Sequence, residues 1–575
     1  MSSPIFSTVK ASMYAKSSIF NLSFENKLTT NWFRLTPFLC KEVLPGDVWR
    51  VNTELFVRLA PMVAPMMQRV RVYTHFFFVP YRLLWEGWES FITQSSNGKY
   101  DDSVPKQLPL AYIDVDDNSV DETLKAFGTG SLSDYLGMNL SAVGLNSSVA
   151  PILDAGHIYF QYLPHLAYQK IWSDFYRDEN LQDDDFEPAH DGIYAIDLSS
   201  PSVVENMLTF LRYRSWKKDY FTSSLPWTQK GPDISLPFVG NLDVVGDISN
   251  ADFNLTKMDL YTSGEATPAS TTNAKIGPLG SQSGALRLAF DDRGGVERSV
   301  VNMSGKASIG TIPSGDLKVD LSSASPVTIN ELRRAVALQR WEELNARGGT
   351  RYVEQLQAHF GVRPRDSRLQ RAEYLGGGVS DVQISEVLQT SETATTPQGQ
   401  MAGHGVSASY NHGFKRYFDE HGVILGIMSV MPDATYYQGM QRMFLKRGVY
   451  DFGWPSLANL GEQPIYVAEL YNDGSNAPAD VEGSAPVFGY TPRYAEYKFS
   501  NNEVHGEFRT SLSQWHAGRV FANEPSLNQQ FISGSRFSPD VFVVSEDVSD
   551  PFWCQIYNDI KVSRKLPKFG TPSVL

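Results

Sequence analysis

Residues 65–85, PMMQRVRVYTHFFFVPYRLLW, limit most strongly what this chain can fold into. Side chains of an extended strand alternate between two faces, and Pro80 ends the ladder pairing. One face would be mostly apolar, with Val70, Val72, Thr74, Phe76 and Phe78. The other face would mix rings with cations, with Arg69, Arg71, Tyr73, His75 and Phe77. Because both faces carry large groups, the pattern predicts a sheet packed within one subunit and also against something outside it.

The composition favours a folded protein rich in strands. Of the 575 residues, 42% are hydrophobic and 20% charged, which is typical of folded rather than disordered chains. The 11 Trp, 27 Tyr and 33 Phe, with 44 Gly and 32 Pro, favour many short strands and long packed loops over a helical bundle. The formal net charge is −14, so any contact with nucleic acid must be a local basic patch.

Cysteine usage and the absence of targeting patterns suggest the compartment. Cys40 and Cys554 are the two cysteines, which excludes a disulfide framework and favours a reducing environment. The N-terminal segment has scattered lysines and no apolar core of signal-peptide length. No window approaches a membrane-spanning run of apolar residues. We therefore expect a cytoplasmic product without a membrane span.

Changes in composition divide the chain into five regions. We expect an N-terminal arm, the first part of a β fold with helical and loop insertions, an exposed aromatic-poor insertion, a helical and Gly-rich region, and C-terminal strands that complete the β fold. Their ranges are 1–30, 31–228, 229–327, 328–405 and 406–575. Strands at both ends must then pair across the middle of the chain, which favours a sandwich whose loops hold most of the mass.

Local patterns predict individual elements within these regions. Strands are expected near 48–59 and 69–80, and at runs beginning near 423, 464, 489, 540 and 553. An apolar stripe predicts a helix from Val203 to Lys218. Thr328 and Glu331 fit a capping box that opens a long helix, and a second helix over 351–360 should end at Gly361.

The sequence contains no recognisable catalytic or metal-binding motif. It has no phosphate-binding loop, no HExxH, no GxSxG and no CxxC. The run 113–122 begins like a calcium loop but has Ser119 where the turn needs Gly. His404, His412 and His421 match no ligand spacing, and the run Asp183–Asp185 reads as a solvated loop. We therefore predict no catalytic residue, cofactor or metal ion.

One basic patch is the best candidate for contact with nucleic acid. Cations interleaved with flat rings are what sequence-tolerant single-strand binding uses, with charge for phosphates and rings for bases. The candidate residues are Arg212, Arg214, Trp216, Lys217 and Lys218. The alternative is a basic helix end that packs its rings inward and pairs its cations with acids. The C-terminal segment with Lys561, Arg564, Lys565 and Lys568 is a weaker candidate.

Several blocks together resemble one family. The blocks are PMMQRVRVYTHFFFVPYRLLWEGWESFIT, SLPWTQKGP, INELRRAVALQRWEELNARGGTRYVEQLQAHFGV, QRAEYLGGG, ISEVLQTS, TPQGQMAGHG and GYTPRYAEYKF. They resemble, in order and over most of the chain, the major capsid proteins of gokushoviruses, small single-stranded DNA phages of the Microviridae.

The resemblance implies a mainly β fold, an eight-stranded antiparallel jelly roll of the viral capsid type with very long loop insertions containing several helices. It also implies pentamers and a T=1 shell of about sixty copies, assembled in the bacterial cytoplasm, with the arm 1–30 on its inner surface. Gln229 to Val327 would be a surface protrusion near the threefold axis that contributes to attachment to a host surface receptor. The implied partners are circular single-stranded DNA, a small basic DNA-binding protein, an internal scaffolding protein and a minor pilot protein. Arg212, Arg214, Trp216, Lys217 and Lys218 would then face the lumen.

Two other functions compete with a capsid role. A carbohydrate- or receptor-binding β-sandwich would stack sugars on exposed rings such as Trp172, Trp341 and Trp515. A β-sandwich glycoside hydrolase would use a pair of carboxylates whose separation is spatial and therefore not visible in the sequence.

Overall fold

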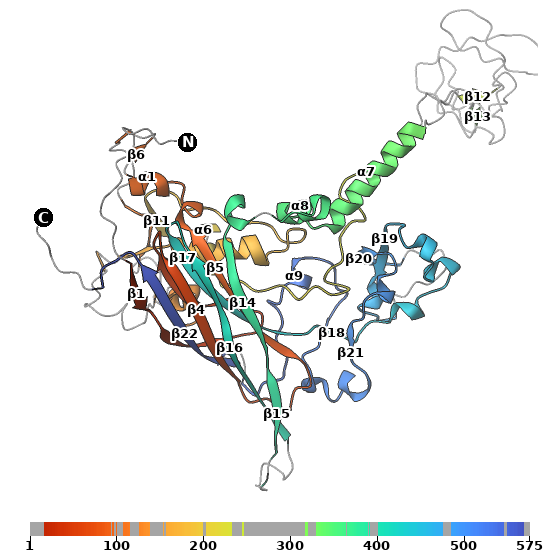
Figure 1. Ribbon diagram of the computed structural model, residues 1–575. Helices are drawn as coiled ribbons and strands as arrows, with labels where there is room; N and C mark the ends of the chain where they lie inside the picture. Colours follow the sequence, from red (N-terminus) through yellow and green to blue (C-terminus); the bar gives the residue numbers. More distant parts are fainter. Residues whose placement is uncertain are drawn as a thin grey trace, which may run out of the picture. The chain divides into compact units, whose positions relative to one another are not determined.

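The computed structural model (Figure 1) describes most of the chain. The described residues are 17–93, 95–96, 99–100, 107–114, 126–138, 153–154, 157–198, 203–232, 244–246, 317–319, 329–363, 365–388, 390, 401–474, 485–544 and 549–568. The chain divides into two compact units, Met1–Lys230 with Glu343–Leu575, and Gly231–Glu342. All that follows concerns the first unit unless stated otherwise.

Two antiparallel sheets form the centre of the first unit. The six-stranded sheet has the order β1-β22-β4-β16-β15, with β2 also paired to β22; the four-stranded sheet has the order β14-β5-β17-β3. The first contains β1 (Ser18–Asn21), β2 (Phe24–Thr30), β4 (Val48–Leu59), β15 (Gln383–Leu388), β16 (Met401–Tyr417) and β22 (Phe552–Arg564). The second contains β3 (Thr36–Val43), β5 (Val70–Pro80), β14 (Glu373–Asp381) and β17 (Gly422–Pro432).

The two sheets pack face to face over a shared apolar core. Alternate residues of β4 and β22 point into this core, and so do Val72, Phe76 and Phe78 of β5. Phe76 lies edge-on to Phe38 at a centroid distance of 5.5 Å. The period-two patterns read from the sequence therefore become the inner faces of a sandwich.

The helices and small sheets come largely from the insertion between β5 and β14. Among its described residues, the first unit contains the α-helices α1 (Trp88–Thr93), α3 (Leu132–Leu136), α5 (Leu163–Ile171), α6 (Val203–Thr209), α8 (Tyr352–Phe360) and α9 (Gln529–Ile532), with the end of α7 (Ile329–Arg347). It also contains the strands β6 (Ser95–Ser96), β7 (Lys99–Tyr100), β8 (Leu110–Asp114), β9 (Leu153–Asp154), β10 (His157–Gln161), β11 (Ile193–Ile196), β18 (Thr435–Tyr436), β19 (Glu462–Tyr466), β20 (Val487–Pro492) and β21 (Asn502–Glu503). The second unit contains β12 (Val244–Gly246), β13 (Leu317–Val319) and most of α7.

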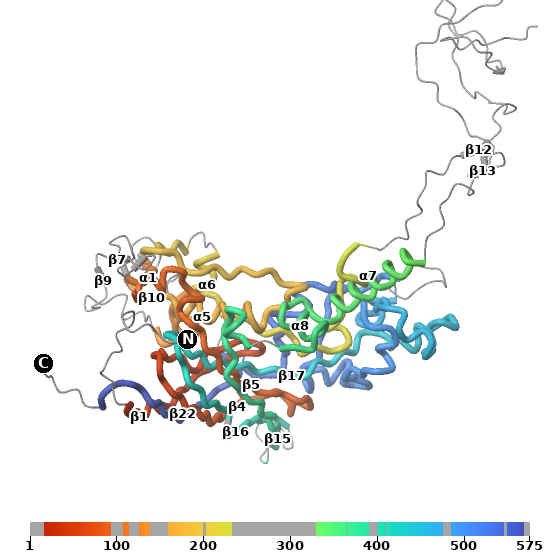
Figure 2. The backbone as a smooth tube through the Cα atoms, turned by 45° about the horizontal axis from the view of Figure 1, so that its top comes forward, coloured from red at the N-terminus to blue at the C-terminus, as the bar shows by residue number. Residues whose placement is uncertain are grey.

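The outer face of the four-stranded sheet is covered by the chain itself. Phe77 and Val79 of β5 and Leu425 of β17 share a second core with residues of α5. In Figure 2, α5 and α6 lie on one side of β5 and β17, and β4 and β22 lie on the other. The expectation that something outside the subunit covers this face is therefore wrong for these positions, because the insertion folds back over them.

Most predicted elements are confirmed, with two exceptions. The strands expected at 48–59 and 69–80 are β4 and β5, and α8 ends before Gly361, whose φ of 67° suits a glycine. The strand expected in the run that begins at Asp540 is absent from its described part, 540–544, where Phe542 makes an isolated bridge to Met62. The rest of that run lies outside the described residues. The helix expected from Val203 to Lys218 ends at Thr209.

Part of the expected N-terminal arm 1–30 is in strands. Ser18–Asn21 and Phe24–Thr30 form β1 and β2, which both pair with β22. Residues 1–16 lie outside the described residues, and so do most of 229–327. The boundaries of the five regions stay a prediction.

Both cysteine side chains are free thiols. Burial raises the pKa of Cys40 to about 12 and also raises the pKa of Cys554. No helix in the part of the chain described is long and apolar enough to cross a membrane.

Candidate functional site

The segment that carries the predicted basic patch is extended rather than helical. Its backbone bonds to two other segments: Arg214 N donates to Phe33 O at 2.7 Å, and Trp216 N donates to Ile532 O at 2.8 Å. These tertiary partners satisfy groups that would otherwise bond within a helix. Tertiary pairing therefore overrides the apolar stripe that predicted a helix beyond Thr209.

Arg212 is held inside the subunit. Its Nη2 lies 2.6 Å from the carboxylate of Asp185, its Nε donates to Gln169 at 2.6 Å, and its guanidinium lies 4.2 Å from the ring centroid of Trp172. Asp184 in turn accepts a bond from the hydroxyl of Ser173 at 2.8 Å. Part of the acidic run predicted as a solvated loop thus binds internal partners.

Trp216 belongs to the core of the subunit. Its side chain is buried, with ring centroids of Phe33 and Phe537 at 4.3 and 5.0 Å and the guanidinium of Arg519 at 4.8 Å. The ring packs mostly within the subunit, although part of it also borders the cleft described next. Its role in stacking stays a prediction.

The lining of a cleft of about 790 Å³ includes Trp216 and the other three candidates, Arg214, Lys217 and Lys218. The guanidinium of Arg214 lies 4.3 Å from the ring of Tyr73 and donates to the hydroxyl of Ser429 at 3.2 Å. Lys217 is exposed, and Lys218 pairs with Asp178. The cleft lies on the outer side of the four-stranded sheet, because its lining includes Phe77, Phe175 and Tyr176, which belong to or pack against the second core.

The cleft has more cations than acids in its lining. The cations are Arg177, Arg214, Lys217, Lys218, Arg347, Arg351 and Arg363, and the acids are Asp178, Glu179 and Glu354. Four of the cations pair with a carboxylate. Within the described residues, Arg214, Lys217 and Arg363 make no ion pair, so they carry the positive charge that a phosphate could use.

A neutral histidine lies beside Arg214. His75 Nδ1 lies 2.7 Å from the hydroxyl of Tyr176. Burial, helped by the charge of Arg214, lowers the pKa of His75 to about 3. At neutral pH His75 therefore adds no positive charge beside Arg214.

The remaining sequence candidates do not gather into a site. His412 bonds to Thr74 at 2.7 Å and His421 packs against Trp88, so the two serve different local contacts. Among the described residues, no group of three or more His, Cys, Asp or Glu side chains could hold a metal ion. Apart from Asp114, the acidic part of the rejected calcium loop lies outside the described residues. Trp172 is buried, whereas Trp341 is exposed and Trp515 half-buried.

Two surfaces were missed by reasoning from the sequence. The first is a patch of exposed apolar side chains over 443–460 and 497–499. It consists of Met443, Phe444, Val449, Tyr450, Phe452, Trp454, Leu460, Tyr497 and Phe499. The second is the outer face of the six-stranded sheet, where alternate residues of β4 and β22 are exposed. The alternation in VWRVNTELFVRL was a readable signal for this face.

Comparisons with known proteins agree over the whole chain. The family described as capsid protein (F protein) matches residues 7–574. Capsid protein VP1 of Chlamydia phage 1 is 34% identical, covering 99% of this chain and 97% of that protein. VP1 of Bdellovibrio phage phiMH2K is also 34% identical, with 98% and 96% covered. VP1 of Spiroplasma virus 4 is 29% identical, with 87% and 84% covered.

Proposed function

The chain belongs to the F protein (VP1) family of Microviridae capsid proteins, and from this premise we propose that it is a jelly roll that closes a T=1 shell of about sixty copies around a circular single-stranded DNA genome. Family membership makes it a structural component of the virion rather than an enzyme. The carbohydrate-binding sandwich and the glycoside hydrolase are thereby replaced as descriptions of the whole chain.

The strand order is the observation that carries the jelly-roll proposal. The eight strands concerned are, in chain order, β2, β3, β4, β5, β14, β16, β17 and β22. Numbered one to eight, they are arranged as 1-8-3-6 in one sheet and 2-7-4-5 in the other. Two facing sheets in which the first strand pairs with the last, and the second with the seventh, are the arrangement of a double Greek key. β1 and β15 extend the first sheet.

The exposed apolar patch supports assembly between identical subunits. Phe444 is 66% exposed and Tyr450 73%, although both are large and apolar for the most part. Lys446 links the two segments of the patch, since its amine lies 4.0 Å from the ring centroid of Tyr497. Large exposed apolar patches on a soluble protein mark contacts with another protein. Contacts between subunits in a closed shell would cover it.

The remaining partners follow from the family resemblance. We propose pentamers as the assembly unit, with a small basic DNA-binding protein, an internal scaffolding protein and a minor pilot protein as partners. Gln229 to Val327 would be the host-attachment protrusion near the threefold axis. At the cleft, Lys217, Lys218 and Arg214 remain candidates to face the lumen. Arg212 and Trp216 would hold the segment that carries Arg214, Lys217 and Lys218 in place.

Assembly can be tested at the patch itself. Replacing Phe444, Tyr450 and Trp454 together by Ser should leave a folded protein that sediments as a small species, because the contact surface is lost. A matched variant, Phe444→Leu with Tyr450→Phe and Trp454→Phe, keeps the surface apolar and should form shells. The measurements are sedimentation velocity and negative-stain imaging, with circular dichroism to check folding.

Two outcomes would contradict the proposal, one for the role of the patch and the other for the formation of a shell. Normal shells from the Ser variant would remove the patch from the subunit contact. An unmodified protein that stays a small species under all assembly conditions would overturn the shell itself.

A further inference from the structure

The outer face of the six-stranded sheet has no cover within the described part of the chain. Its exposed side chains come from neighbouring strands and include rings, for example Phe56 of β4, Trp553 and Tyr557 of β22 and Tyr417 of β16. Tyr557 is 43% exposed and Tyr417 59%. The opposite side of each of these strands lies in the sandwich core. This face is therefore a built, rigid surface that displays rings to solvent.

A row of three like charges crosses this face. The register pairs Arg50 of β4 with Lys415 of β16 on one side and with Lys561 of β22 on the other. All three side chains are exposed. Directly opposed residues on one face of a sheet have Cβ atoms about 4.5–5.5 Å apart, and like charges at that spacing destabilise the sheet. The row is thus an arrangement that the free subunit does not favour.

The row has little internal compensation. Lys561 lies 3.9 Å from Asp559, two residues along the same strand. Arg50 and Lys415 form no ion pair with any residue that the structure describes. The middle cation and one of its neighbours therefore lack a counter-charge, and an anionic ligand would supply it.

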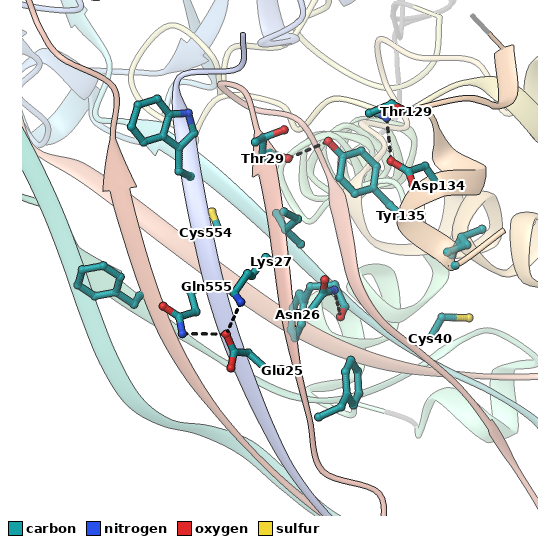
Figure 3. Close-up of a pocket in the computed structure, with 18 of the residues that line it drawn as sticks. Glu25, Asn26, Lys27, Thr29, Cys40, Thr129, Asp134, Tyr135, Cys554 and Gln555 are labelled. Atoms are coloured by element: carbon teal, nitrogen blue, oxygen red, sulfur yellow. Dashed lines mark hydrogen bonds and ion pairs between the residues drawn. The ribbon is translucent and has the colours of Figure 1, made fainter. Parts of the chain in front are cut away.

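At the other end of the same face, one cation lies beside an acid. Figure 3 shows a cavity of about 910 Å³ next to β2, in which Glu25 lies between Lys27 and Gln555. Lys27 is 3.3 Å from the Glu25 carboxylate, and Gln555 donates to it at 2.8 Å. At this end Lys27 has a carboxylate partner, whereas Arg58 of β4 is exposed and makes no ion pair with any described residue. What distinguishes the three-cation row is that like charges face one another directly across neighbouring strands.

Rings flank the row on both sides. Tyr417 is two residues beyond Lys415 on β16, and Tyr557 is four residues before Lys561 on β22. Residues two apart in a strand are about 7 Å apart and point the same way, so both rings share the face with the cations. Cations for phosphates beside rings for bases are the combination used by proteins that bind single strands without sequence preference.

We propose that this face binds single-stranded DNA, with phosphates on Lys415, Arg50 and Lys561 and bases stacked on Tyr417 and Tyr557. The inference rests on the proposed function, since it names the surface that would meet the enclosed genome. It also competes with the basic cleft. The cleft lies outside the four-stranded sheet and the cation row outside the six-stranded sheet, on opposite sides of the sandwich. An acidic protein segment would use the cations but would have no need of the rings.

The central experiment measures how salt weakens binding of a fluorescein-labelled oligothymidylate to the unassembled full-length protein. Each phosphate contact on a single strand contributes about 0.7 to the slope of log affinity against log salt. The triple variant Arg50→Gln, Lys415→Gln, Lys561→Gln should therefore lower that slope by about 2. A matched triple of exposed cations elsewhere, Arg365→Gln, Arg368→Gln, Arg536→Gln, should leave it unchanged.

A second pair of variants separates stacking from charge. Tyr417→Leu and Tyr557→Leu should each weaken binding about tenfold while leaving the salt slope as it was, because a lost stacked base removes no phosphate contact. Lys217→Glu with Lys218→Glu, in the cleft, should change the slope little. Particles assembled from the triple Gln variant should be closed and should contain less DNA than unmodified particles.

Each outcome tests either DNA binding by the sheet face or the proposed shell function. An unchanged slope in the triple Gln variant, or a slope lowered only by the cleft variant, overturns the sheet face while the shell stands. Equal loss of binding to a poly-glutamate peptide, with no effect of the Tyr variants, also overturns it and identifies an acidic protein segment as the occupant. Failure of the unmodified protein to form particles is instead a failure of the proposed function.

Discussion

The two outer faces of the sandwich differ in whether another part of the chain covers them. The insertion between β5 and β14 buries Phe77 and Leu425 beneath α5, so the outer face of the four-stranded sheet became a second core. The outer face of the six-stranded sheet has exposed rings and an unbalanced row of cations. Two sheets of one sandwich thus have different roles: one stabilises the subunit, and the other is available to something that is not part of it.

Removing a ring from each face should give the largest contrast. Phe77→Ala deletes a fully buried ring and should lower the free energy of unfolding by about 3–5 kcal/mol. Phe56→Ala, on the uncovered face, should cost about 1 kcal/mol or less. Urea unfolding of the unassembled protein, followed by tryptophan fluorescence, measures both. Equal losses would mean that the two faces do not differ as described.

Acid should weaken the covered side. His165 of α5 is buried, its Nε2 lies 2.9 Å from the hydroxyl of Ser133, and burial lowers its pKa to about 4. The unfolded chain binds a proton below about pH 6.5, whereas the folded one does not, so this contribution is complete above that pH and is lost as the pH falls toward about 4. The loss should reach about 1.4 kcal/mol for each pH unit.

His165→Gln provides the control for this pH dependence. The difference in unfolding free energy between about pH 7 and about pH 5 should be smaller in the variant than in the unmodified protein. Part of the dependence should remain, because the pKa of His75 is lowered in the same direction. An identical pH dependence in both proteins would show that His165 does not contribute.

The smallest effect is expected on the uncovered face. Arg50→Glu converts the row into alternating charges and should raise the free energy of unfolding by about 0.2–1 kcal/mol at low salt. High salt should remove most of the difference, because exposed charges are screened. Thermal unfolding at two salt concentrations measures this. A variant less stable than the unmodified protein at low salt would contradict the repulsion assigned to the row.

How far the sequence predicted the fold depended on how local each signal was. The alternation in β4 and β5 and the glycine after α8 depend on neighbours a few residues away, and these elements formed as expected. The segment Phe210–Lys218 looked helical, but its backbone bonds to residues near 33 and 532, which no local pattern can show. The same contacts placed Trp216 in the core, although the alternation of cations and rings around it suited a surface that stacks bases.

The blocks of sequence by themselves determined the capsid family, because several long matches in the same order along the chain are far more specific than any single motif. Period-two patterns determined which side chains share a face of each strand. Tertiary structure alone decided which faces are covered, since burial depends on where a long insertion folds back. It also decided the charges that meet across β16, β4 and β22, because strand register joins residues more than 350 positions apart, and only that register places Arg50 between two lysines.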